Sequence, residues 1–137
     1  MFNQTFIVNR EDFANAGKVS TKIKGILKQL GVTSDVLRKI AVACYEAEIN
    51  LIIHSYGGEI ILEITEDGVV YLSFNDKGPG IDDLEKALTP GFSTASTQAR
   101  EFGFGAGMGL PNIKRVSDIF EINTSPAGTN LKIGFNI

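Results

Sequence analysis

Four glycines alternate with other small or apolar residues in Gly103-Phe104-Gly105-Ala106-Gly107-Met108-Gly109-Leu110-Pro111, and a helix is expected to follow. Pro111 suits the first turn of a helix, because its missing N–H would have no partner there. Glycine lets a ligand approach the backbone closely. A helix N-terminus presents unpaired N–H groups at the positive end of the helix dipole. This segment therefore predicts either a phosphate-binding loop or a flexible hinge at a tight helix start. The choice between these two interpretations depends on the motifs in the rest of the sequence.

Length and composition favour a single domain covering residues 1–137, long enough to bury its own core. The net charge of −3 argues against a nucleic-acid partner, which would need a basic stripe. A single cysteine excludes an internal disulfide framework, and one cysteine with one histidine argues against a zinc cluster. The N-terminus lacks a signal-peptide pattern, and no apolar run reaches the roughly 20 residues that span a bilayer. We expect a cytoplasmic protein with no membrane partner.

The pattern of apolar residues predicts the order of the secondary-structure elements. Strands are expected at residues 5–8, 59–65, 69–74, 120–124 and 129–135, and helices at 10–30, 34–55, 81–88 and 110–118. The segment 89–102 is rich in Ser, Thr and Ala and predicts a mobile loop. Because the strands are grouped in hairpins, the order predicts an α+β fold. We expect a two-layer sandwich with helices on one face of a mixed, mostly antiparallel sheet.

Two polar residues, Glu46 and Asn50, lie four positions apart in the expected second helix and so stack on one side of it. They border its apolar stripe, which is formed by Val36, Leu37, Ile40, Ala43, Cys44, Ala47 and Leu51. Asn supplies a neutral oxygen that suits Mg²⁺, and a nearby Glu could accept a proton from a hydroxyl. The alternative is two solvated helix positions without chemistry.

Three other residues of this helix have structural interpretations. Glu48 points nearly opposite Glu46 around the helix, so we expect it at the surface. Cys44 lies within the apolar stripe and is expected in the core. His54 continues the line of Glu46 by two further turns, and we expect it to make a helix-end hydrogen bond.

Asp76 follows a buried strand and precedes Gly78 and Gly80. A carboxylate at this place can accept a hydrogen bond from an amino group such as that of adenine, and the glycines would let a flat ligand approach. The alternative is an ordinary Asp-Gly turn. Thr129 follows Gly128 into the last strand, and its alternative is a turn residue. The sequence contains neither a P-loop nor a Rossmann fingerprint.

Together these segments resemble the ATP-binding fold shared by gyrase, histidine kinases and MutL, the GHKL or Bergerat class. The four motifs occur in the family's order as residues 46–50, 76–80, 103–110 and 128–129. The short chain and the segments 90–94 and 105–111 are most similar to bacterial anti-sigma-factor and switch serine kinases. Two departures are visible: Ile49 stands where those kinases more often have a polar residue, and the last motif is reduced to Gly128-Thr129.

The resemblance implies a role for each matched residue. Glu46 would be the general base for a serine hydroxyl, and Asn50 would hold Mg²⁺. Asp76 would bind the adenine amino group with support from Thr129 through water, and the adjacent glycines would admit the nucleotide. Residues 89–105 would form the ATP lid, in which Arg100 would contact the γ-phosphate. The residues implied to wrap the phosphates are Gly103, Gly105, Gly107, Met108, Gly109 and Leu110. The glycines implied to admit the nucleotide are Gly78 and Gly80.

The function implied is an Mg-ATP-dependent serine/threonine kinase that phosphorylates a STAS-domain antagonist in a partner-switching system. Some members of the family also bind a sigma factor or a phosphatase, and a homodimer stays open. One alternative is an ATP-gated module that sequesters a sigma factor or another regulator without significant kinase activity. Another is a detached ATP-binding domain of a histidine kinase.

Overall fold

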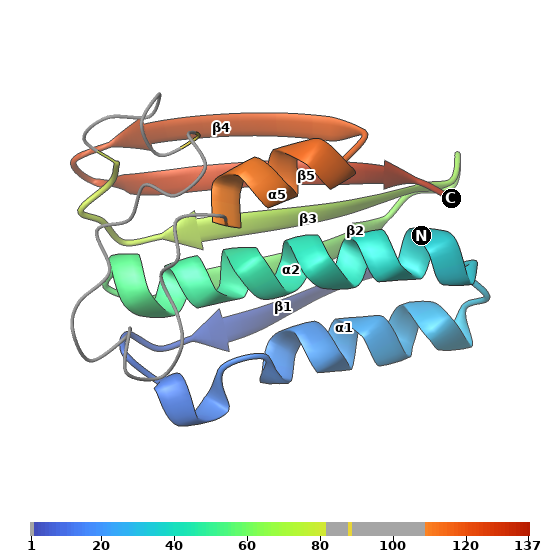
Figure 1. Ribbon diagram of the computed structural model, residues 1–137, viewed down its shortest axis with the longest axis horizontal. Coiled ribbons are helices and arrows are strands. Elements are labelled where there is room, and N and C mark those ends of the chain that lie inside the picture. The colour runs from blue at the N-terminus through green and yellow to red at the C-terminus, as the bar shows by residue number, and fades with distance from the viewer. Residues whose placement is uncertain (1, 82–87, 89–108) are drawn as a thin grey trace.

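The computed structural model describes residues 2–81, 88 and 109–137. Within them, three helices cover one face of a five-stranded sheet (Figure 1). The helices are α1 (Lys18–Gln29), α2 (Ser34–His54) and α5 (Gly109–Val116), and a short 3₁₀ helix, η1 (Phe13–Asn15), precedes α1. The strands are β1 (Phe2–Val8), β2 (Gly58–Ile64), β3 (Val69–Asp76), β4 (Ile119–Ser125) and β5 (Gly128–Asn136). This is the predicted two-layer α+β architecture.

The strand order in the sheet is β1-β2-β3-β5-β4, and every pairing among the described strands is antiparallel. The expected mixture of parallel and antiparallel strands is therefore not seen in this part of the chain. β2 and β3 form a hairpin that turns at Gly68, whose φ of 84° lies in the left-handed region that glycine adopts readily. Alternate side chains of β3, at Val70, Leu72 and Phe74, are buried under the helices.

Helix α2 lies at the centre of the helical layer, between α1 and α5 (Figure 1). Most of its predicted apolar stripe is buried, including Ile40, Ala43 and Cys44. It packs with buried residues of the sheet such as Leu62 and Leu72 in one continuous core. This central position explains why α2 can present residues both to α5 and to α1.

The N-terminal helix starts later than the apolar periodicity predicts. Gly17 adopts a left-handed conformation with φ of 89°, which separates η1 from α1. A left-handed residue cannot continue a right-handed helix, so α1 begins at Lys18. The helix expected at 81–88 falls almost entirely outside the described residues, and Ile81 and Leu88 at its ends are not helical. No helix in the described part of the chain is long and apolar enough to cross a membrane.

Candidate functional site

The predicted segments lie in the same half of the molecule. In Figure 1, β3 and α2 end at the left, β5 begins there, and α5 begins somewhat nearer the centre, with its start facing the same side. Asp76 is the last residue of β3, Thr129 is the second residue of β5, and α5 begins at Gly109. The fold thus gathers the polar residues of this half from segments that are far apart in the sequence.

Glu46 and Asn50 lie directly against the start of α5. A Cβ atom built on Gly109 would lie 3.2 Å from Asn50 Nδ2, 3.3 Å from Asn50 Oδ1 and 3.4 Å from Glu46 Oε2. These contacts are tight, so a glycine at this place lets the backbone of α5 approach both polar side chains. Glu46 and Asn50 are each only partly buried, so they border the core as their helical positions predict.

Burial affects the acid–base properties of this part of α2. It raises the pKa of the Glu46 carboxyl above its ordinary value of 4.5. A raised pKa makes a carboxylate a better proton acceptor, provided that it is ionised at the working pH. Burial also lowers the pKa of His54, so its imidazole is favoured in the neutral form.

Asp76 is held by two backbone N–H groups. Its Oδ1 accepts hydrogen bonds from Gly78 N at 2.9 Å and from Thr129 N at 2.8 Å. Its Oδ2 has no hydrogen-bond partner among residues 2–81, 88 and 109–137. One carboxylate oxygen is therefore fixed by backbone N–H groups of the described residues.

The glycines after Asp76 pack against the β4–β5 hairpin. A Cβ on Gly80, where φ is 90°, would lie 2.0 Å from the carbonyl oxygen of Ser125. A Cβ on Gly78, where φ is 106°, would lie 3.1 Å from the carbonyl oxygen of Pro126. Both glycines are thus required by close backbone packing against the β4–β5 hairpin, a reason that neither the ligand-approach interpretation nor the Asp-Gly turn alternative included.

Thr124 was not predicted as part of this site. Its Oγ1 accepts a hydrogen bond from Ile81 N at 2.8 Å and lies 2.9 Å from the hydroxyl oxygen of Thr129. Thr124 therefore connects the end of the glycine turn to the residue that holds Asp76. Because Thr124 pairs with Thr129 across the β4–β5 hairpin, the short interval between the strands predicted at 120–124 and 129–135 was a signal that could have identified it.

The prediction that Glu48 lies at the surface is wrong. Glu48 does point away from Glu46, but α1 covers that side of α2, and the residue is only 1% exposed. Its carboxylate accepts hydrogen bonds from Gly17 N at 3.1 Å, Val19 N at 3.3 Å and Ser20 N at 2.9 Å, and from Ser20 Oγ at 2.6 Å. Glu48 therefore caps the N-terminus of α1, which has no acidic residue in its own first turn.

Two further residues of α2 are buried. Cys44 lies in the core as predicted, and burial, with a smaller contribution from the nearby Glu48, raises the pKa of its thiol to about 12. Ile49 is also buried, at 4% exposure, so its side chain does not form part of an exposed partner surface. Burial disfavours a polar side chain without a partner, which agrees with the apolar residue in this motif position.

Most of the predicted phosphate-binding segment lies outside the described residues. This applies to Gly103, Gly105, Gly107 and Met108, and also to the expected lid at 89–105 with Arg100. Leu110 is described, and its side chain belongs to the hydrophobic core. Any contact of Leu110 with a phosphate would therefore use its backbone N–H.

Residues 10–135 match the family described as "Histidine kinase-like ATPase domain", so the chain belongs to this family of ATP-binding domains. Its relatives include bacterial proteins named as anti-sigma factors and as a serine/threonine-protein kinase. The "Anti-sigma F factor" of Bacillus velezensis is 36% identical over 117 residues, which cover 81% of this chain and 77% of that protein. The "Serine/threonine-protein kinase RsbT" of Bacillus subtilis is 32% identical over 114 residues, covering 80% of this chain and 78% of RsbT. The chain is therefore a member of the GHKL anti-sigma-factor serine kinase family.

Solved structures show the same fold at low sequence identity. The RsbU and RsbW domains of Rv1364c from Mycobacterium tuberculosis align with a TM-score of 0.69 and 16% identity, over 99% of this chain and 32% of that one. The SiaB-SiaC complex from Pseudomonas aeruginosa contains a chain that aligns with a TM-score of 0.61 and 15% identity, over 96% of this chain and 88% of that one. These likenesses confirm the predicted fold class.

Proposed function

We propose that this protein is an Mg-ATP-dependent serine/threonine kinase whose acceptor is a STAS-domain antagonist in a partner-switching system. The observation that carries the proposal is the meeting of Glu46 and Asn50 with Gly109 at the start of α5. A carboxylate, an amide and a helix N-terminus are the groups needed beside a triphosphate and an attacking hydroxyl. Relatives that include a named serine/threonine kinase support it further.

The adenine end of the nucleotide is assigned to Asp76. Its Oδ2 can accept a hydrogen bond from the adenine amino group, while Oδ1 stays fixed by Gly78 N and Thr129 N. A guanine base presents a carbonyl oxygen at the corresponding place, which a carboxylate would repel. The arrangement therefore favours ATP over GTP.

The phosphate end is assigned to α2 and α5. The first N–H groups of α5 lack helical partners and can bind phosphate oxygens. The described residues contain no cluster of three or more His, Cys, Asp or Glu that could hold a metal. Asn50 Oδ1 with waters and phosphate oxygens would therefore complete the shell of Mg²⁺, which commonly keeps several waters. When bound, Mg²⁺ neutralises phosphate charge.

Glu46 acts on the acceptor. Its carboxylate takes the proton from the serine or threonine hydroxyl as that oxygen forms its bond to the γ-phosphorus. The bond between the γ-phosphorus and the β–γ bridging oxygen breaks, and ADP leaves. The raised pKa of Glu46 supports this role, because the carboxylate then holds the transferred proton more firmly.

The test uses the full chain, radiolabelled ATP and purified STAS-domain proteins encoded near its gene. We expect Glu46→Gln to lower phosphate transfer at least about 100-fold and to retain nucleotide binding by calorimetry. Glu121→Gln is the matched control, since Glu121 is exposed on β4. Transfer by Glu46→Gln at the wild-type rate would refute the base assignment. Acid-labile phosphate on the product would instead indicate histidine phosphorylation.

A second candidate is an ATP-gated module that sequesters a regulator. The similarity to proteins named "Anti-sigma F factor" favours it. Pull-down of candidate sigma factors with and without ATP tests it, with phosphate transfer measured in the same samples. Nucleotide-dependent binding without any transfer would support the module and contradict the kinase.

A further inference from the structure

Helix α1 is strongly basic, although the whole chain has a net charge of −3. Its twelve residues include Lys18, Lys22, Lys24 and Lys28 and no acidic residue. All four lysines are exposed, and none forms an ion pair with another described residue. They form two like-charge pairs at i,i+4 spacing, each of which destabilises an isolated helix by about 0.2–0.5 kcal/mol. The stability of the domain alone therefore does not account for this charge pattern.

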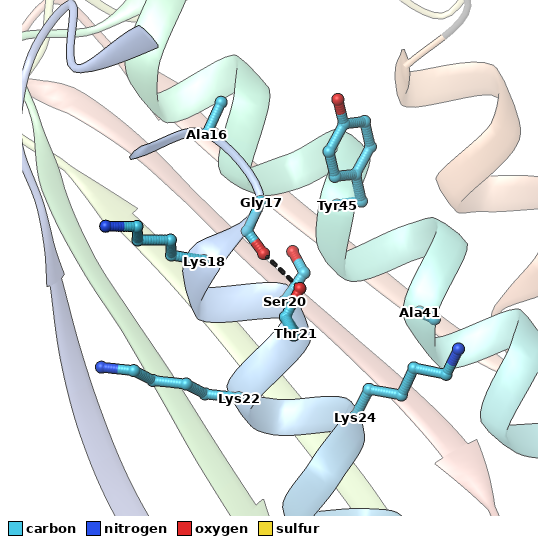
Figure 2. A pocket seen from close by; sticks show the side chains of 9 residues that line it. All are labelled: Ala16, Gly17, Lys18, Ser20, Thr21, Lys22, Lys24, Ala41 and Tyr45. Atoms are coloured by element: carbon cyan, nitrogen blue, oxygen red, sulfur yellow. Dashed lines mark hydrogen bonds between the residues drawn. The ribbon is translucent and has the colours of Figure 1, made fainter. Parts of the chain in front are cut away.

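The two lysine pairs lie on different sides of α1. Figure 2 shows Lys24 reaching toward Ala41 of α2, whereas Lys18 and Lys22 extend in the opposite direction. Lys24 and Lys28 line an open hollow of about 580 Å³ between α1 and α2. This hollow adjoins the one in Figure 2, with which it shares Lys24, Ala41 and Tyr45.

The hollow combines positive charge with exposed apolar surface. Arg38 of α2, which also pairs with Asp35 at 3.1 Å, adds a third cation beside Lys24 and Lys28. Val42 and Tyr45 are 40% and 39% exposed and lie in the same lining. Tyrosine and arginine are enriched at protein interfaces, where an apolar centre is surrounded by polar groups. A nucleic acid would use the cations but not the apolar centre, so the chemistry favours a protein.

The same hollow reaches the candidate site, because Glu46 is part of its lining. A segment bound between α1 and α2 would therefore end beside the residue assigned as the proton acceptor. The opposite face of α2, at Glu48, is closed by α1 and offers no such access.

We infer that the hollow formed by Lys24, Lys28, Arg38, Val42, Tyr45 and Glu46, the docking groove, binds an acidic segment of the phosphoacceptor protein. The acidic side chains of that segment pair with the cations, and its apolar side chains cover Val42 and Tyr45. The bound segment presents its hydroxyl to Glu46. This inference rests on the proposed kinase function and specifies the chemistry of the acceptor.

The test compares two charge-reversed variants of the same helix. K24E/K28E alters the docking groove, and K18E/K22E makes the same change at the same spacing on two lysines that line the adjoining hollow but not the docking groove. The probe is a fluorescein-labelled amphipathic peptide with Glu and Leu side chains around one serine, and its counterpart carries Lys in place of Glu. Binding is measured by fluorescence anisotropy, and circular dichroism checks that both variants are folded.

We expect the acidic peptide to bind the wild type more tightly than the lysine peptide does. K24E/K28E should weaken its binding roughly tenfold or more, and K18E/K22E should change it less than about threefold. Equal losses in the two variants, or no preference for the acidic peptide, would overturn the inference. Tighter binding of a short duplex DNA through Lys24 and Lys28 would also overturn it, in favour of a nucleic-acid surface.

The outcome is independent of catalysis, because peptide binding is measured without phosphate transfer. If the groove binds as expected and no acceptor is ever phosphorylated, the kinase proposal fails and the docking surface stands. If phosphate is transferred and K24E/K28E leaves the KM for the acceptor unchanged, the docking groove is refuted and the kinase proposal stands.

Discussion

Replacing Glu48 by alanine should strongly destabilise the fold, although the residue was expected at the surface. Its carboxylate accepts four hydrogen bonds, three from backbone N–H groups at the start of α1 and one from the hydroxyl of Ser20. Hydrogen bonds to charged groups contribute about 1.5–3 kcal/mol each, and buried donors left without partners cost about 1–3 kcal/mol each. These terms are not additive, so the combined cost of losing the carboxylate and leaving its donors unpaired is expected to be about 3–5 kcal/mol. We expect a loss in that range for Glu48→Ala.

Urea unfolding followed by circular dichroism measures the effect. Glu48→Gln should lower the free energy of unfolding by less, about 2 kcal/mol. Its amide oxygen can keep some of the hydrogen bonds, whereas its amide nitrogen is itself a donor and cannot accept from the N–H groups that it faces. Glu121→Ala, at an exposed position on β4, should stay within about 0.5 kcal/mol of the wild type. The dependence of the unfolding free energy on urea should be unchanged. A Glu48→Ala protein within about 1 kcal/mol of the wild type would refute the capping role.

Four further predictions concern the site and the core. Gly109→Ala should change stability by less than about 1 kcal/mol, but its methyl would crowd Asn50. We expect affinity for Mg-ATP to fall roughly tenfold by calorimetry. Burial raises the pKa of Glu46, so phosphate transfer should rise with pH through a midpoint above 4.5. Because the folded-state pKa is the higher one, the free energy of unfolding should fall over the same interval, and Glu46→Gln should remove this dependence. Cys44 is buried with a pKa of about 12, so iodoacetamide at pH 8 should alkylate it about 100-fold faster in urea than in the folded protein. Thr124→Val should weaken ATP binding about 3- to 10-fold, whereas Thr124→Ser should not.

Much of the sheet and of α2 could be predicted because each depends on local periodicity. Alternating apolar residues gave β3 its buried face, with Val70 and Leu72 under the helices. The four-residue spacing of Glu46 and Asn50 placed both at the border of the core, where Gly109 meets them. Local patterns succeed here because one neighbouring layer decides which side of each element is buried.

The sequence did not predict which side of α2 would be covered by a second helix. Glu48 looks solvated when its helix is considered alone, since a charged residue opposite a polar border normally faces water. Its burial depends on α1 beginning at Lys18, which in turn depends on the left-handed conformation of Gly17. Thr124 was missed for a similar reason, because its role requires the turn that ends at Ile81 to pack on the β4–β5 hairpin. Contacts between elements distant in the sequence decided both cases.

The position of Glu48 also links the two proposals physically. It lies on α2 between Glu46 and Asn50 in sequence, but it binds the first turn of α1, the helix that supplies Lys24 and Lys28 to the docking groove. A segment that binds the groove therefore contacts two helices whose relative position is fixed by buried, charge-assisted hydrogen bonds. Glu46, which is a lining residue of that groove, is consequently held at a defined place relative to the lysines. A rigid groove of this kind can orient a hydroxyl beside its proton acceptor without moving α1 or α2, which is the positioning that phosphoryl transfer requires.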